Sequence, residues 1–313
     1  MAKRNKQQKN KQLHDEFVKT NLSDKTMAQD FMRQFLPSEL INKLDLKGLE
    51  LDTNSYITTE LAKYYSDLVW LCPYNKNTIR IALLLEHKSS LVAYPHLQLL
   101  RYMLEIWEKN QKEAQPFLPI VPIIFYHGDS KWHVRPMIDY FKGIESELYQ
   151  YIPQFNYELV DVSQYSDETI LSFKIGLLKN VLLALSHSRD QNYLRQNFGF
   201  LFIEADEYIQ TPKGVDFIKT MFVYLLKNTE FSDEDIENML NQIPSPLNNI
   251  AMSTYDRLIY KGLREGIEKG IENEKIEVIK NARLNGLDIE TISKIVKLPT
   301  LKIRQILDDS GIE

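Results

Sequence analysis

The chain has 313 residues, a net charge of −5 and a hydrophobic fraction of 43%, all ordinary for a globular protein. The negative balance excludes a surface that is basic everywhere, although a local basic groove would still suffice to bind nucleic acid. The single cysteine, Cys72, excludes an internal disulfide and a cysteine-based zinc site, and the longest apolar runs are too short to cross a bilayer. We therefore expect a cytoplasmic protein without membrane contact.

The chain begins with polar and then helical patterns. Residues 1–13 are rich in lysine and predict a basic flexible tail, with a phosphate-touching arm as the functional alternative. Residues 14–36 carry apolar side chains at mostly helical spacing, and Pro37 ends that pattern. A second helix is expected over 54–65, with Asn54 as a capping residue.

Short apolar runs follow and predict strands. The segment 67–72 is expected to form a short strand, and 79–87 has five consecutive apolar residues, as is typical of a strand covered on both faces. Residues 93–112 predict a helix, and strands are expected over 119–128 and 155–163. This order of helices and strands indicates an α/β domain.

The predicted helix over 93–112 has one feature that bears on function. Leu97, Leu100, Leu104 and Trp107 are expected to form its buried stripe. Arg101 would lie within that stripe, where a guanidinium is costly unless it is paired. Arg101 is therefore a candidate for a phosphate contact, with a structural ion pair as the equal alternative.

The rest of the chain is expected to be helical. Helical patterns over 168–186 and 213–228 complete a first domain that we place at residues 14–242. A cluster of Pro, Ser and Asn around Pro244 then indicates a boundary, and residues 250–313 form a helical C-terminal region.

Two features of that C-terminal region leave alternatives open. Gly262, Gly266 and Gly270 recur every four residues, which fits a helical linker or the seam of a homodimer. The segment 277–309 reads as helix, turn, helix, turn, helix and resembles a helix-turn-helix that either contacts DNA or only packs and dimerises. Its core is expected to include apolar residues from each helix: Ile289, Ile292, Ile295, Val296, Leu298, Leu301, Ile303 and Ile306.

The residues that indicate chemistry are Asp67, Glu86 and Lys88. Glu86 and Lys88 are two positions apart at the end of the predicted central strand, so their side chains should point to the same side. Asp67 opens the neighbouring strand and could bring its carboxylate alongside. Two carboxylates can hold a hard divalent cation, and a lysine can stabilise charge on a phosphate. A structural ion pair is the alternative, because an acid-x-Lys triplet alone has little specificity.

Four motifs in order make the chain resemble a known family. They occupy 65–70, 83–90, 99–103 and 125–128. Together they resemble the Rpn family of recombination-promoting nucleases, also described as YhgA-like transposases, within the PD-(D/E)XK nuclease superfamily. The resemblance spans roughly residues 14–240. It implies a restriction-endonuclease-like core, a central mixed sheet flanked by helices, with a helical C-terminal tail.

The resemblance also implies roles for individual residues. Asp67 and Glu86 would be the metal-binding acids and Lys88 the lysine of the (D/E)XK motif, although Ser66 stands where the superfamily often has proline. Either Glu60 or Asp15 could add a further metal ligand. Gln98 and His127, like Arg101, are weaker candidates for substrate contact or site support.

The function that follows is a DNA endonuclease that uses a divalent metal, with Mg²⁺ expected and Ca²⁺ or Mn²⁺ as alternatives. The expected partners are DNA and, through the C-terminal helices, a second copy of the chain. The competing hypothesis is a non-catalytic DNA-binding or assembly protein with a degenerate nuclease core.

Overall fold

The computed structural model describes residues 2–52, 68–76, 79–227 and 231–311. The chain divides into two compact units, Met1–Ala251 and Met252–Glu313. Within the described residues, every helix is too short or too polar to cross a bilayer.

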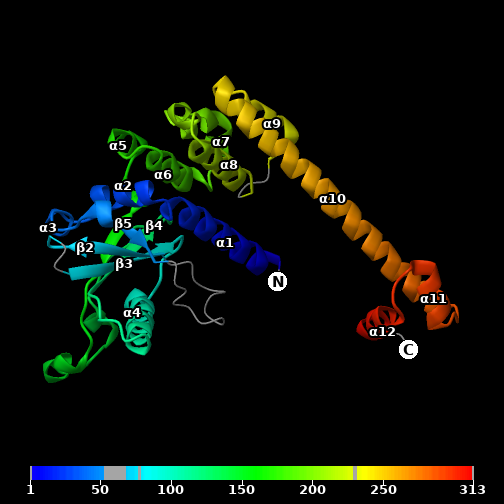
Figure 1. Ribbon diagram of the computed structural model, residues 1–313, viewed down its shortest axis with the longest axis horizontal. Helices are drawn as coiled ribbons and strands as arrows, with labels where there is room; N and C mark the ends of the chain where they lie inside the picture. The colour runs from blue at the N-terminus through cyan, green and yellow to red at the C-terminus, as the bar shows by residue number, and fades with distance from the viewer. Residues whose placement is uncertain (1, 53–67, 77–78, 228–230, 312–313) are drawn as a thin grey trace. The chain divides into compact units, whose positions relative to one another are not determined.

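The first unit is built around a mixed five-stranded sheet in the order β1-β2-β3-β4-β5 (Figure 1). Strands β1 to β3 are antiparallel neighbours, whereas β3, β4 and β5 run parallel. The strands are β1 (Glu50–Leu51), β2 (Leu68–Tyr74), β3 (Ile79–Lys88), β4 (Ile120–Tyr126) and β5 (Glu158–Asp161). The prediction of an α/β unit with a central mixed sheet is therefore confirmed, and β3 lies at its centre, as its apolar run indicated.

Helices cover both faces of this sheet (Figure 1). On one face lies α4 (Pro95–Lys112), which packs against Ile124 and Tyr126 of β4. On the other face lies α2 (Lys25–Phe35), whose Phe31 ring meets the ring of Phe125 edge-on at 5.3 Å. Because side chains alternate along a strand, neighbouring residues of β4 serve opposite layers of the core.

The N-terminal helices differ in extent from the prediction. Helix α1 (Ala2–Leu22) includes most of the segment expected to be a flexible tail. The helix expected over 14–36 is divided, because Asp24 caps a new helix by accepting hydrogen bonds from the backbone N–H groups of Thr26 and Met27 at 2.9 and 3.2 Å. The helix expected over 54–65 lies outside the described residues.

Of the stripe predicted for α4, Trp107 packs against the core, but two of the leucines are exposed. Leu97 and Leu104 are 51% and 47% exposed, and the helix instead turns a different set of side chains into the core. That set is Leu99, Tyr102, Met103 and Ile106. Both faces of α4 carry leucine, so spacing alone could not decide between them.

Shorter elements complete the first unit. Between α2 and β2 lie α3 (Ser38–Ile41) and η1 (Leu46–Gly48); between β4 and β5 lie η2 (Met137–Tyr140) and η3 (Ser146–Tyr151). After β5 come η4 (Val162–Gln164), α5 (Asp167–Ser172), α6 (Leu178–His187), α7 (Gln191–Asn197), η5 (Phe198–Phe202), η6 (Ala205–Tyr208), α8 (Pro212–Lys227) and α9 (Asp233–Leu240). The helix expected over 168–186 is thus two helices, α5 and α6.

The second unit is helical. It contains the later part of α10 (Ser245–Leu284), followed by α11 (Ile289–Val296) and α12 (Thr300–Asp309). Its buried core consists of Ile279, Ile292, Val296, Ile303 and Leu307.

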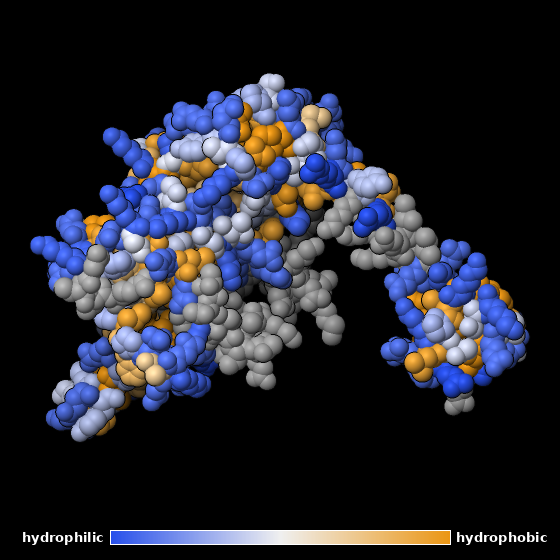
Figure 2. All heavy atoms as spheres, in the orientation of Figure 1, coloured by the Kyte–Doolittle hydropathy of each residue, from blue (hydrophilic) through white to orange (hydrophobic). Residues whose placement is uncertain are grey.

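Two of the residues predicted for that core are not in it. Ile295 and Leu301 are 54% and 80% exposed, and Figure 2 shows apolar side chains reaching the surface of this unit among hydrophilic ones. The pairs Ile292–Val296 and Ile303–Leu307 are each four residues apart and so share one side of their helices, which turns Ile295 and Leu301 away from the core.

Candidate active site

The centre of the site is a buried ion pair at the end of β3. Glu86 and Lys88 both lie on the α4 side of the sheet, with exposed fractions of 3% and 6%. The Lys88 ammonium donates a hydrogen bond to Oε1 of Glu86. The prediction that these two side chains share one side of the strand is confirmed.

Gln98 of α4 joins this pair and closes a small network. Its Oε1 accepts a hydrogen bond from Lys88 Nζ at 2.7 Å, and its Nε2 lies 2.7 Å from Oε1 of Glu86. The same Nε2 lies 2.8 Å from the hydroxyl of Tyr102. Sequence reasoning identified Gln98 only as a weaker candidate and did not identify Tyr102. Their spacing of four residues on one helix predicts that the two side chains lie side by side.

The environment of Glu86 is unfavourable to a lone carboxylate. Burial raises the pKa of Glu86 above its usual value, and the nearby carboxylate of Asp15 raises it further, whereas the ammonium of Lys88 lowers it. Within the described part of the chain, the Oε2 atom of Glu86 is buried without a hydrogen-bond partner. An anionic oxygen in that state fits a bound cation, because a cation would supply the missing counter-charge.

The opposite face of β3 carries a chain of hydrogen bonds through histidines. His87 Nδ1 lies 2.7 Å from Oδ1 of Asp15, and His87 Nε2 lies 2.9 Å from Nδ1 of His127. Because an ionised carboxylate only accepts, the hydrogen bond between His87 and Asp15 is donated by Nδ1 of His87. Asp15 of α1 is thereby held beside the strand end that carries Glu86.

His127 is buried and contacts His14 as well as His87. Its ring lies 4.8 Å from that of His14, whose Nδ1 is 2.7 Å from the hydroxyl of Tyr224. Burial lowers the pKa of His14 to about 3, and burial with the nearby His87 lowers the pKa of His127 well below its usual value. Both rings are therefore neutral near pH 7 and link α1 and α8 to the residue that follows β4.

The structure does not bring the other sequence candidates into this network. Asp67 and Glu60 are outside the described residues, although β2 begins with Leu68, which pairs with Leu85 next to Glu86. Arg101 is exposed on α4 rather than buried in an apolar stripe, because the buried side of the helix is a different one; its charge acts on Glu105. Among the described residues, no group of three His, Cys, Asp or Glu side chains is arranged to hold a metal.

Comparisons with known proteins agree with these observations at the level of the family. A family model described as "Putative transposase, YhgA-like" matches residues 12–210. The recombination-promoting nuclease RpnA of Escherichia coli (strain K12) is 26% identical over 217 residues, which cover 68% of this chain and 72% of the relative. An inactive recombination-promoting nuclease-like protein of the same organism, RpnE, is 25% identical over 291 residues, covering 91% of this chain and 94% of the relative. No solved structure matches.

Proposed function

The chain belongs to the YhgA-like family, and we propose that it is a metal-dependent DNA endonuclease that acts in recombination of mobile elements. The observation that carries the proposal is the buried Glu86–Lys88–Gln98 network, in which one oxygen of Glu86 has no hydrogen-bond partner within the described residues. The mixed sheet flanked by helices fits the restriction-endonuclease-like core that we propose as the finer fold.

The residues have distinct tasks in this proposal. Asp67 and Glu86 would hold a divalent cation, for which we propose Mg²⁺, with Asp15 or Glu60 as a further acid. When bound, such a cation lowers the pKa of a water molecule and offsets the negative charge of the scissile phosphate. Lys88 would donate a hydrogen bond to the attacking water or to a phosphate oxygen.

Gln98 is a positioning residue in this account. Its amide bonds Lys88 through the oxygen and Glu86 through the nitrogen, so it fixes the distance between them. A side chain held by two such bonds keeps the lysine in place before substrate arrives, which reduces the reorganisation needed during the reaction.

A second function is favoured by a specific observation, the inactivity stated in the name of RpnE, which matches 91% of this chain. In that case the chain would be a DNA-binding or assembly protein with a degenerate nuclease core. The exposed Lys302 and Arg304 on α12 would contact DNA, or the C-terminal helices would join two copies.

Cleavage of supercoiled plasmid DNA separates the two functions. We expect the folded wild type to nick or linearise the plasmid with Mg²⁺ or Mn²⁺ and to be inactive in EDTA. The Asp67→Ala variant should be inactive under the same conditions. DNA binding without cleavage by any divalent metal would favour the second function, and cleavage by Asp67→Ala at the wild-type rate would show that the proposed metal site is wrong.

A further inference from the structure

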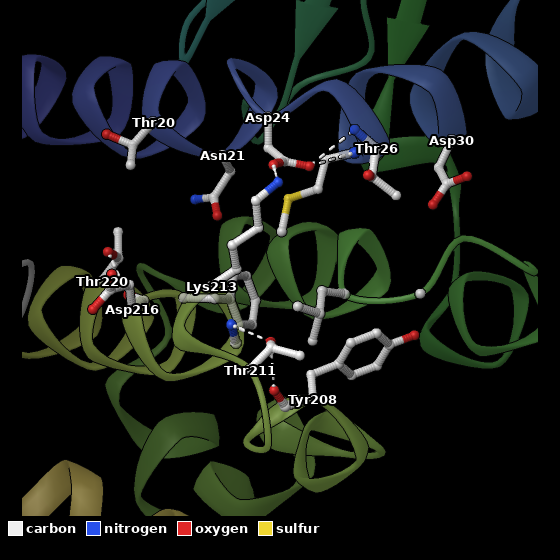
Figure 3. Close-up of a pocket in the computed structure, with 15 residues that line it drawn as sticks. Thr20, Asn21, Asp24, Thr26, Asp30, Tyr208, Thr211, Lys213, Asp216 and Thr220 are labelled. Carbon is white, nitrogen blue, oxygen red and sulfur yellow. Dashed lines mark hydrogen bonds and ion pairs between the residues drawn. The ribbon is translucent and has the colours of Figure 1, made fainter. Parts of the chain in front are cut away.

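A separate cavity of about 340 Å³ lies in the first unit, away from the Glu86 network. It is bounded by the junction of α1 and α2 on one side and by η6 and the start of α8 on the other. Figure 3 shows Asp24 and Asp30 descending from the first side, with Lys213 and Tyr208 facing them from the second. A volume of this size is in the range of small-molecule sites.

Part of the wall of this cavity is apolar. Met27, Leu177 and Phe217 line it, and the ring of Tyr208 adds an aromatic face. Phe217 is buried, so its ring is held in place by the surrounding core. Such walls can pack against a small apolar body, and each apolar group removed from water contributes to binding.

The charges around the cavity are unbalanced. Its lining carries the carboxylates of Asp24, Asp30 and Asp216 but only one ammonium, that of Lys213. Lys213 is already engaged, because its Nζ lies 2.7 Å from Oδ2 of Asp24. The other oxygen of Asp24 caps α2. Arg33 and Lys219, which do not line the cavity, pair with Oδ1 of Asp30 at 3.0 Å and with Oδ1 of Asp216 at 3.2 Å, so the lining itself holds more carboxylates than cations although each carboxylate has a cationic neighbour.

Asp30 and Tyr208 present their oxygens at one place on the wall. Oδ1 of Asp30 accepts a hydrogen bond from Arg33 at 3.0 Å. A β-carbon added to Gly176 would lie 3.0 Å from the hydroxyl of Tyr208 and 3.9 Å from Oδ2 of Asp30, so these two oxygens flank the same glycine. Burial raises the pKa of Asp30, although Arg33 opposes this effect, which indicates a carboxylate that a further cation would stabilise.

We propose that this cavity binds a small organic ammonium compound with an apolar body. The ammonium group would donate hydrogen bonds to Oδ2 of Asp30 and to the hydroxyl of Tyr208. The apolar body would pack against Met27, Leu177 and Phe217. This proposal is independent of the nuclease function, since none of these residues belongs to the Glu86 network.

A ligand in this cavity would also affect the position of α1. Thr20 and Asn21 border the cavity near the end of α1, and the same helix carries Asp15, about 8 Å further back at 1.5 Å per residue. A ligand that contacts both sides of the cavity would hold α1 and α2 against α8, and thus stabilise the position of Asp15 beside His87.

Binding is tested with three probes that share one phenyl body: phenethylammonium, the neutral 2-phenylethanol and the anionic phenylacetate. Isothermal titration and the shift in thermal midpoint are measured on the full chain. We expect saturable binding of phenethylammonium in the millimolar range, with the neutral probe weaker by about tenfold or more because it lacks a charge-assisted hydrogen bond. Absence of saturable binding, or equal binding of phenylacetate, would overturn the proposal, the latter because Lys213 would then be the recognition group.

Matched variants locate the site. Asp30→Asn should weaken phenethylammonium by about tenfold or more, and Tyr208→Phe, which removes one hydroxyl, by severalfold. Asp216→Asn is the control, since that carboxylate is 76% exposed at the rim and should change affinity less than about twofold. If Asp30→Asn does not fold, the affinity of Tyr208→Phe for phenethylammonium is the test. Unchanged affinity in a folded Asp30→Asn or, failing that, in Tyr208→Phe overturns the proposal.

Discussion

Removing the ammonium of Lys88 is the sharpest perturbation of the buried network. In Lys88→Met, the carboxylate of Glu86 stays buried and retains the hydrogen bond from Gln98 Nε2 at 2.7 Å on Oε1. Its Oε2 atom has no partner within the described residues even before the change. Breaking one partner out of a buried ion pair costs about 3–5 kcal/mol, and we expect Lys88→Met to lose free energy of unfolding in that range.

The double variant tests the reason for this loss. Glu86→Gln combined with Lys88→Met removes both charges and keeps similar volumes, so its free energy of unfolding should return to within about 1 kcal/mol of the wild type. Urea unfolding is followed by tryptophan fluorescence in EDTA near neutral pH. All three tryptophans, Trp70, Trp107 and Trp132, lie in the first unit, so the signal reports on the unit that holds the pair.

A small effect would refute this reasoning. If Lys88→Met unfolds within about 1 kcal/mol of the wild type, Glu86 is hydrated or otherwise neutralised, as expected for an exposed ion pair. If the double variant is as unstable as the single one, the loss comes from side-chain packing rather than from an uncompensated charge.

Three further predictions concern other parts of the chain. Burial lowers the pKa of His96, whose Nδ1 lies 2.7 Å from the hydroxyl of Tyr140. The unfolded chain therefore binds one more proton than the folded chain below about pH 6.5, so the free energy of unfolding decreases as the pH falls. In His96→Gln, the free energy of urea unfolding should decrease less steeply toward acid pH, and a profile identical to that of the wild type would contradict this. Gly214→Ala should cost about 1–3 kcal/mol by urea unfolding, because its β-carbon would lie 1.9 Å from the backbone oxygen of Tyr208; a neutral effect would show that α8 moves freely there. Ile303→Ala should cost the second unit about 2–5 kcal/mol, seen as faster amide exchange in α11 and α12 with unchanged exchange in the sheet, whereas faster exchange in both would show that the two units unfold together.

Local patterns were sufficient for the parts of the site that lie on one strand. The apolar run before Glu86 indicated a central strand, and alternation along that strand placed Glu86 and Lys88 on one side. Both expectations depend only on neighbouring residues, and the structure confirms both. The role of Asp67 stays a prediction, because that residue lies outside the described part of the chain.

Contacts between distant segments could not be predicted in this way. The sequence pattern predicts the buried side of α4 only in part, because leucines occur on several sides of that helix, and only the packing of α4 on the sheet selects Leu99 over Leu97. The hydrogen bond between His14 and Tyr224 joins residues that are 210 positions apart, so no periodicity reveals it. Neutral buried histidines arise from such packing, and their pKa values follow from it rather than from the local sequence.

The most direct test of the central claim is the rate at which Glu86→Gln cleaves plasmid DNA with Mg²⁺, measured at single turnover beside Glu108→Gln. Glu108 is an exposed acid on α4, so its amide variant controls for the loss of one negative charge. We predict wild-type cleavage by Glu108→Gln and a rate reduced by about a hundredfold or more in Glu86→Gln. Cleavage by a folded Glu86→Gln at the wild-type rate would contradict the assignment of Glu86 as a metal-binding catalytic acid.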